Sequence, residues 1–62
     1  MSRPMYVENK ETSMIYKMDG GTIVVWLNNK KRWSRCCTTI SDYVKRMSDY
    51  RIIPEHKIEE YL

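Results

Sequence analysis

The chain has 62 residues, of which 42% are hydrophobic, and its formal net charge at pH 7 is +3. At this length, burial of apolar surface only roughly offsets the conformational entropy of the chain. Such a chain has no room for a substrate cleft enclosed by its own core, so we expect one small binding domain over residues 1–62 and not an enzyme.

The first segment, residues 1–12, is mostly polar and contains one short apolar run, Met5-Tyr6-Val7. We expect it to be a flexible arm or an edge strand. It lacks the apolar stretch of a secretory signal peptide. The longest apolar run of the chain, residues 23–27, is far shorter than a membrane-spanning segment. The sequence therefore predicts a cytoplasmic location and no contact with a membrane.

Residues 14–37 are predicted to form two or three antiparallel strands. Residues 14–18 and 22–27 flank Asp19-Gly20-Gly21, whose Asp-Gly pair supplies the positive φ that a tight hairpin turn needs. The run Asn28-Asn29-Lys30-Lys31 predicts a second turn, because asparagine tolerates the left-handed region. A third strand then covers residues 32–37.

Side chains alternate between the two faces of a sheet, so the pairing of Trp26 with Trp33 decides which residues share a face. If the two tryptophans lie opposite each other, their face also carries Ile15, Lys17, Val24, Lys31 and Arg35. The opposite face then carries Met14, Tyr16, Met18, Ile23, Val25 and Leu27, which we predict to be the core face.

After the sheet, the apolar spacing changes from two to about 3.6 residues, which is typical of a helix. Apolar side chains at Ile40, Tyr43, Val44, Met47 and Tyr50 form one stripe of an amphipathic helix. Thr39 is a suitable N-cap for it, and Asp42 completes a capping box.

Pro54 ends this helical region and suits the first turn of a second, short helix through Tyr61. The expected fold class is therefore α+β: a small two- or three-stranded antiparallel sheet packed against one amphipathic helix, plus a short C-terminal helix.

Side chains with catalytic or metal-binding chemistry are few. Cys36 and Cys37 are adjacent, and His56 is the single histidine. Together they do not supply four ligands at the spacing of a zinc site. We expect no catalytic residue, no metal ion and no cofactor.

Basic residues are concentrated in the middle of the chain. Residues 28–51 carry seven basic and two acidic side chains, whereas the rest of the chain carries four basic and six acidic ones. A basic segment that also contains both tryptophans is typical of a surface that faces phosphates, and equally of one that recognises an acidic protein. The candidate binding residues are Lys17, Trp26, Lys30, Lys31, Trp33 and Arg35.

The leading hypothesis is a small regulatory protein that binds nucleic acid, with the tryptophans stacking on bases and the basic side chains on phosphates. The alternative is an inhibitor of the kind that viruses or mobile elements encode, which binds an acidic host protein through the same Trp/Arg surface. A third hypothesis is a homodimer that buries an uncovered apolar face. The sequence leaves open whether the termini cover the two tryptophans or leave them exposed.

Overall fold

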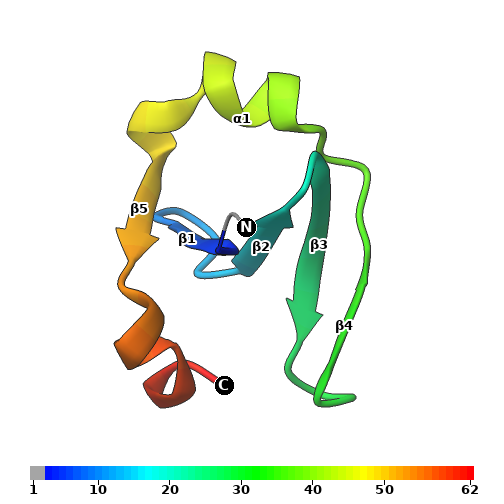
Figure 1. Ribbon diagram of the computed structural model, residues 1–62, viewed down its shortest axis with the longest axis vertical. Helices are drawn as coiled ribbons and strands as arrows, with labels where there is room; N and C mark the ends of the chain where they lie inside the picture. Colours follow the sequence, from blue (N-terminus) through cyan, green and yellow to red (C-terminus); the bar gives the residue numbers. More distant parts are fainter. Residues whose placement is uncertain (1–2) are drawn as a thin grey trace.

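The computed structural model describes residues 3–62, so Met1 and Ser2 of the predicted arm lie outside the described residues. A five-stranded antiparallel sheet with the strand order β4-β3-β2-β1-β5 dominates the fold (Figure 1). The strands are β1 (Met5–Asn9), β2 (Ile15–Asp19), β3 (Thr22–Leu27), β4 (Arg32–Arg35) and β5 (Tyr50–Ile53). The helical segments are α1 (Ile40–Lys45) and two 3-10 helices, η1 (Met47–Asp49) and η2 (Glu55–Glu60).

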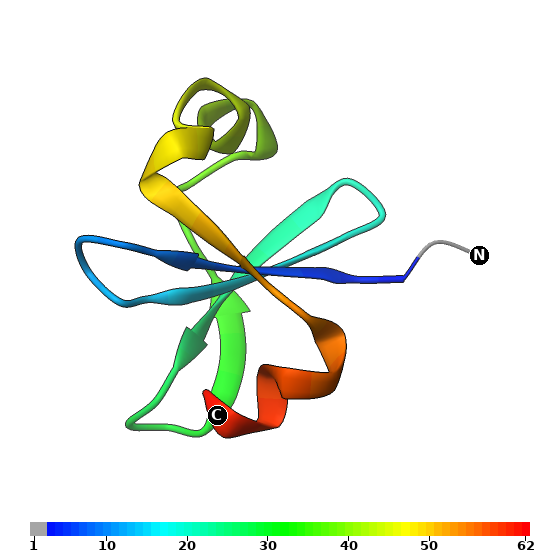
Figure 2. The same cartoon turned by 90° about the vertical axis from the view of Figure 1, so that its left-hand side faces the viewer.

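Strands β1 to β4 follow one another as hairpins, and the chain then crosses to the far edge of the sheet. Figure 1 shows α1 bridging the β4 side and the β5 side. β5 pairs with β1, with Val7 opposite Ile52 and Glu8 opposite Arg51. The sheet is strongly twisted, so β5 crosses the other strands at a steep angle in Figure 2.

Residues in the left-handed region shape the turns. Gly20 and Gly21 connect β2 to β3 with φ of 58° and 87°, as a two-residue type I′ turn requires. In the turn between β3 and β4, Lys31 takes the left-handed conformation at φ 54°, and not the asparagine that we had expected to do so. Between β1 and β2, Asn9 Oδ1 accepts hydrogen bonds from the backbone N–H of Glu11 and Thr12 at 2.8 and 3.1 Å.

The sheet is covered on both faces, which gives the protein two apolar clusters. The α1-side core consists of Val7, Tyr16, Met18, Val25 and Tyr43. The η2-side core consists of Ile15, Ile53 and Ile58, with Tyr6, Trp26, Trp33 and Leu62 packed against it. The predicted hairpin, the third strand and the inward direction of Tyr16 and Val25 are confirmed.

The predicted fold class is wrong, because there is no long amphipathic helix among the described residues and the sheet has five strands. Helix α1 ends at Lys45, and the expected stripe fails beyond Tyr43: Val44 is 58% exposed and Met47 is 53% exposed. Ser48 and Asp49 are poor residues for a helix interior. The last residue of the stripe, Tyr50, begins β5 instead and pairs with Asn9 of β1.

The prediction for residues 1–12 is also corrected. β1 is an interior strand, hydrogen-bonded to β2 on one side and to β5 on the other. Val7 at its centre has no exposed surface at all. Pro54 ends a strand rather than a helix, and the predicted C-terminal helix is the 3-10 helix η2. None of the helices in residues 3–62 is long and apolar enough to cross a membrane.

Candidate binding surface

Trp26 and Trp33 face each other across β3 and β4, as predicted. Their ring centroids lie 5.2 Å apart, with an interplanar angle of 63°. Both rings pack against the η2-side core, to which η2 contributes Ile58, and both keep part of their surface exposed. The C-terminal segment therefore covers the tryptophans only in part. One part of each ring packs against the core, and another part is exposed on the surface.

A row of cross-strand neighbours runs beside the tryptophans on the same face. Tyr6 pairs with Lys17, Lys17 with Val24, and Val24 with Arg35. The Lys17 ammonium lies 5.0 Å from the centroid of the Trp33 ring, and the Tyr6 ring lies 6.0 Å from Trp33 on centroids. Four strands thus bring aromatic rings and cations into one surface.

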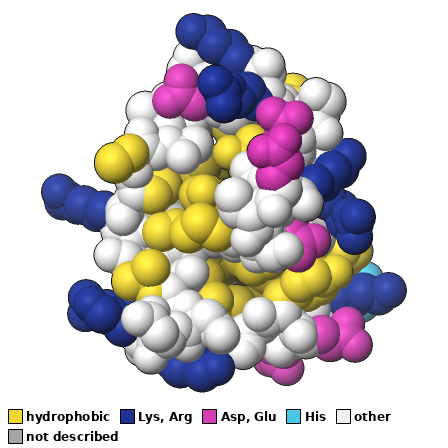
Figure 3. Space-filling model, turned by 180° about the vertical axis from the view of Figure 1, so that it is seen from behind, with side chains coloured by type: hydrophobic (Ala, Val, Ile, Leu, Met, Phe, Trp, Pro, Cys, Tyr) yellow, Lys and Arg dark blue, Asp and Glu magenta, His cyan; other side chains and the backbone are white. Residues whose placement is uncertain are grey.

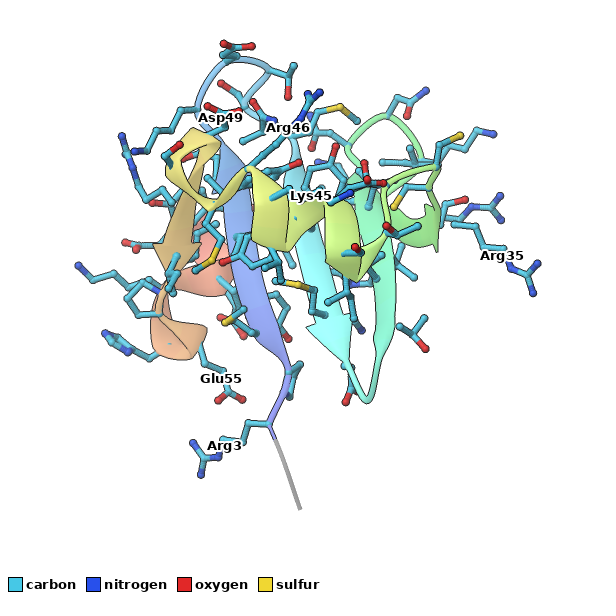
Figure 4. The ribbon with its side chains drawn as sticks, turned by 90° about the horizontal axis from the view of Figure 1, so that it is seen from above. Arg3, Arg35, Lys45, Arg46, Asp49 and Glu55 are labelled. Atoms are coloured by element: carbon cyan, nitrogen blue, oxygen red, sulfur yellow. The ribbon has the colours of Figure 1, made fainter. Side chains whose placement is uncertain are left out.

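We call this the aromatic–basic surface. It consists of Tyr6, Lys17, Trp26, Trp33 and Arg35. Arg35 is exposed on the edge strand β4, and Figure 4 shows its side chain projecting outward, whereas Lys45 lies at the end of α1 and Arg46 directly follows it.

The turn between β3 and β4 holds the two remaining predicted binding residues. Lys30 donates its backbone N–H to the Leu27 carbonyl at 3.0 Å, and the Lys31 ammonium donates to Asn28 Oδ1 at 3.1 Å. The expectation that Lys31 shares the face of the tryptophans by strand alternation is wrong, because Lys31 precedes β4 and has a left-handed backbone. Both lysines are exposed at the tip of the turn, at the end of β3 that carries Trp26.

One acidic side chain on this face has a basic neighbour of its own. Glu8 is opposite Ile15 in the sheet, and its carboxylate lies 4.0 Å from the Arg51 guanidinium. Glu8 therefore has its cationic neighbour on β5, whereas the Lys17 ammonium lies over the Trp33 ring.

The perturbed ionisable groups lie away from this surface. Burial raises the pKa of Tyr16, which belongs to the α1-side core. The Thr39 hydroxyl beside Asp42 lowers the pKa of that carboxyl group at the start of α1. Within residues 3–62, no three His, Cys, Asp or Glu side chains lie close enough together to hold a metal ion. The surface itself combines three aromatic rings, Tyr6, Trp26 and Trp33, with the cations Lys17 and Arg35.

Sequence reasoning missed Tyr6 as a member of the surface. Its strand forms a hairpin with β2 and pairs with β5 over a long sequence separation, and residues 10–13 have no Asp-Gly or Asn-Gly pair that would reveal the hairpin register. The apolar run Met5-Tyr6-Val7 was the one available signal. The chain matches no protein-family model, and comparisons with curated proteins and with solved structures found no match either.

Proposed function

We propose that this protein binds nucleic acid through the aromatic–basic surface. The observation that carries the proposal is the position of the Trp33 ring: partly exposed, flanked by Tyr6, and covered by the Lys17 ammonium at 5.0 Å. Exposed aromatic rings beside cations are the arrangement by which sheet proteins hold bases and phosphates at once.

The energies of the competing contacts favour a stacked base over the resting lysine. An exposed cation–π contact such as Lys17 on Trp33 is worth roughly 0.5–1 kcal/mol. Base–aromatic stacking is worth roughly 1–3 kcal/mol per base. A base can therefore displace the ammonium from the ring, and the displaced ammonium is then free to contact the phosphate of the same nucleotide.

The direct test is a titration of a fluorescein-labelled oligonucleotide of about 12 nucleotides, as single strand and as duplex, at several salt concentrations. Lys17→Ala and Arg35→Ala should weaken binding, and each should reduce the steepness of the salt dependence by about one unit on a log–log plot. The matched controls are Lys45→Ala at the end of α1 and Arg46→Ala at its C-cap, which remove the same charges from residues outside the aromatic–basic surface (Figure 4).

The controls should leave the salt dependence close to that of the parent protein. If neither nucleic acid binds at low salt, the proposal is rejected and an acidic protein partner becomes the remaining hypothesis for this surface. Equal losses in all four variants would show that binding follows net charge alone and does not use the aromatic–basic surface.

A further inference from the structure

A groove of about 510 Å³ lies at the end of the sheet where β2 begins and β3 ends. Met14 and Leu27 give it apolar walls, and Trp26 and Tyr61 add aromatic rings. Its volume is in the range of sites that hold one small molecule. Figure 3 shows the molecule from behind, with hydrophobic side chains open to solvent across the middle and Lys and Arg side chains projecting all around the margin.

The groove is continuous with the aromatic–basic surface through one shared side chain, Trp26. The Trp26 indole N–H is buried and has no acceptor among residues 3–62. A ligand that shifts this ring therefore breaks no hydrogen bond, and an acceptor brought within its reach would pair a donor that is otherwise unsatisfied.

The polar part of the groove is formed by Ser13 and two asparagines, with a cation beside them. Asn28 and Asn29 line the groove, and the Lys31 ammonium is held 3.1 Å from Asn28 Oδ1, with Lys30 next to it in the turn. No Asp or Glu side chain belongs to the described lining. These groups suit a flat, uncharged ring with hydrogen-bonding edges inside the groove and a negative charge at its mouth.

We infer that the groove receives one unstacked base of a single-stranded nucleic acid. The base lies against Trp26 and Tyr61, the Asn28 and Asn29 amides meet its edge, and its phosphate lies near Lys31. The inference rests on the proposed function and makes it more specific. A base in a duplex reaches such a groove only by leaving its stack and its partner, which costs a few kcal/mol, so the single strand is the preferred ligand.

The test compares a mixed-sequence single strand of about 12 nucleotides with its duplex, using two groove variants. The parent protein should bind the single strand about tenfold more tightly than the duplex, as expected when one base is held by stacking. Asn29→Ala and Tyr61→Ala should reduce single-strand affinity at least about fivefold and leave duplex affinity unchanged.

Ile52→Ala is the matched control, because Ile52 is 60% exposed on β5 and does not line the groove. It should change neither affinity, and circular dichroism should show that every variant is folded. Equal affinity of the parent for both nucleic acids, together with unchanged binding by the two groove variants, overturns the inference and leaves the proposed function standing. Absence of binding to both nucleic acids overturns the proposed function itself.

Discussion

Val7→Ala is the substitution that best tests the position of β1 in the sheet. Val7 lies between β2 and β5 and contacts the α1-side core, with none of its surface exposed. If residues 1–12 were an arm or an edge strand, shortening this side chain would have little effect on stability.

The structure predicts a large loss. Burial is worth roughly 0.8 kcal/mol per CH₂ group, and the cavity left in a packed core adds to the loss, so removal of two methyl groups should cost about 2–3 kcal/mol. A chain of 62 residues has a free energy of unfolding of roughly 3–9 kcal/mol. For a domain of this size, each kcal/mol lowers the melting temperature by roughly 4–8 °C, so we expect a drop of about 8–24 °C.

Thermal and urea unfolding followed by circular dichroism measure this loss. The matched control is Val44→Ala, the same chemical change at a position that is 58% exposed on α1, and it should stay within about 0.5 kcal/mol of the parent. Equal melting temperatures for Val7→Ala and the parent protein would refute the placement of β1 inside the sheet.

Three other changes probe the tryptophan pair, the cations and the start of α1. Trp33→Ala should remain folded but lose about 2 kcal/mol in a denaturant melt, because the ring is partly buried against Trp26; an unchanged melt would mean that the ring does not pack. If the four cations Lys17, Lys30, Lys31 and Arg35 each contact one phosphate, the log–log slope of affinity against salt should be about −2.8 for a single strand and about −3.6 for a duplex. A slope near zero would contradict the electrostatic part of the proposal. Thr39→Ala should cost about 1 kcal/mol by removing the N-cap of α1. The pKa of Asp42 is lowered in the folded protein, so its contribution to the free energy of unfolding is present above the unfolded pKa of about 4 and is lost as the pH falls through the lowered value. The difference in stability between the parent and Asp42→Asn should therefore shrink as the pH is lowered. A difference that stays constant would be evidence against this role.

The parts of the fold that follow from neighbouring residues could be predicted from the sequence. Gly20 and Gly21 can take the positive φ of a tight turn between two apolar runs, and this turn fixes the register of β2 and β3. Alternation along those strands then separates Tyr16 and Val25 from Trp26. The members of the aromatic–basic surface on β2, β3 and β4 were predicted for the same reason.

The pairing of β1 with β5 could not be predicted in this way. It joins segments more than 40 residues apart, such as Tyr6 and Ile53, and no turn residue connects them. The segment before β5 also has the spacing of a longer helix than the one it forms, because Tyr43, Val44 and Met47 follow helical spacing although α1 ends at Lys45 and only Tyr43 is buried. Spacing shows that a stripe exists, but it does not show whether the rest of the chain covers it.

Because both faces of the sheet are covered, the two tryptophans among the candidate binding residues also pack against a core. A chain of 62 residues has few large apolar side chains to bury, and Trp26 and Trp33 lie where η2 covers the sheet incompletely. Each ring has one part against Ile15, Ile53 and Ile58 and another part toward solvent. A ligand stacked on these rings would bury the ring surface that η2 leaves exposed. Under the proposed function, binding and stability at this face depend on the same two rings, so substitutions there have to be judged by both measurements together.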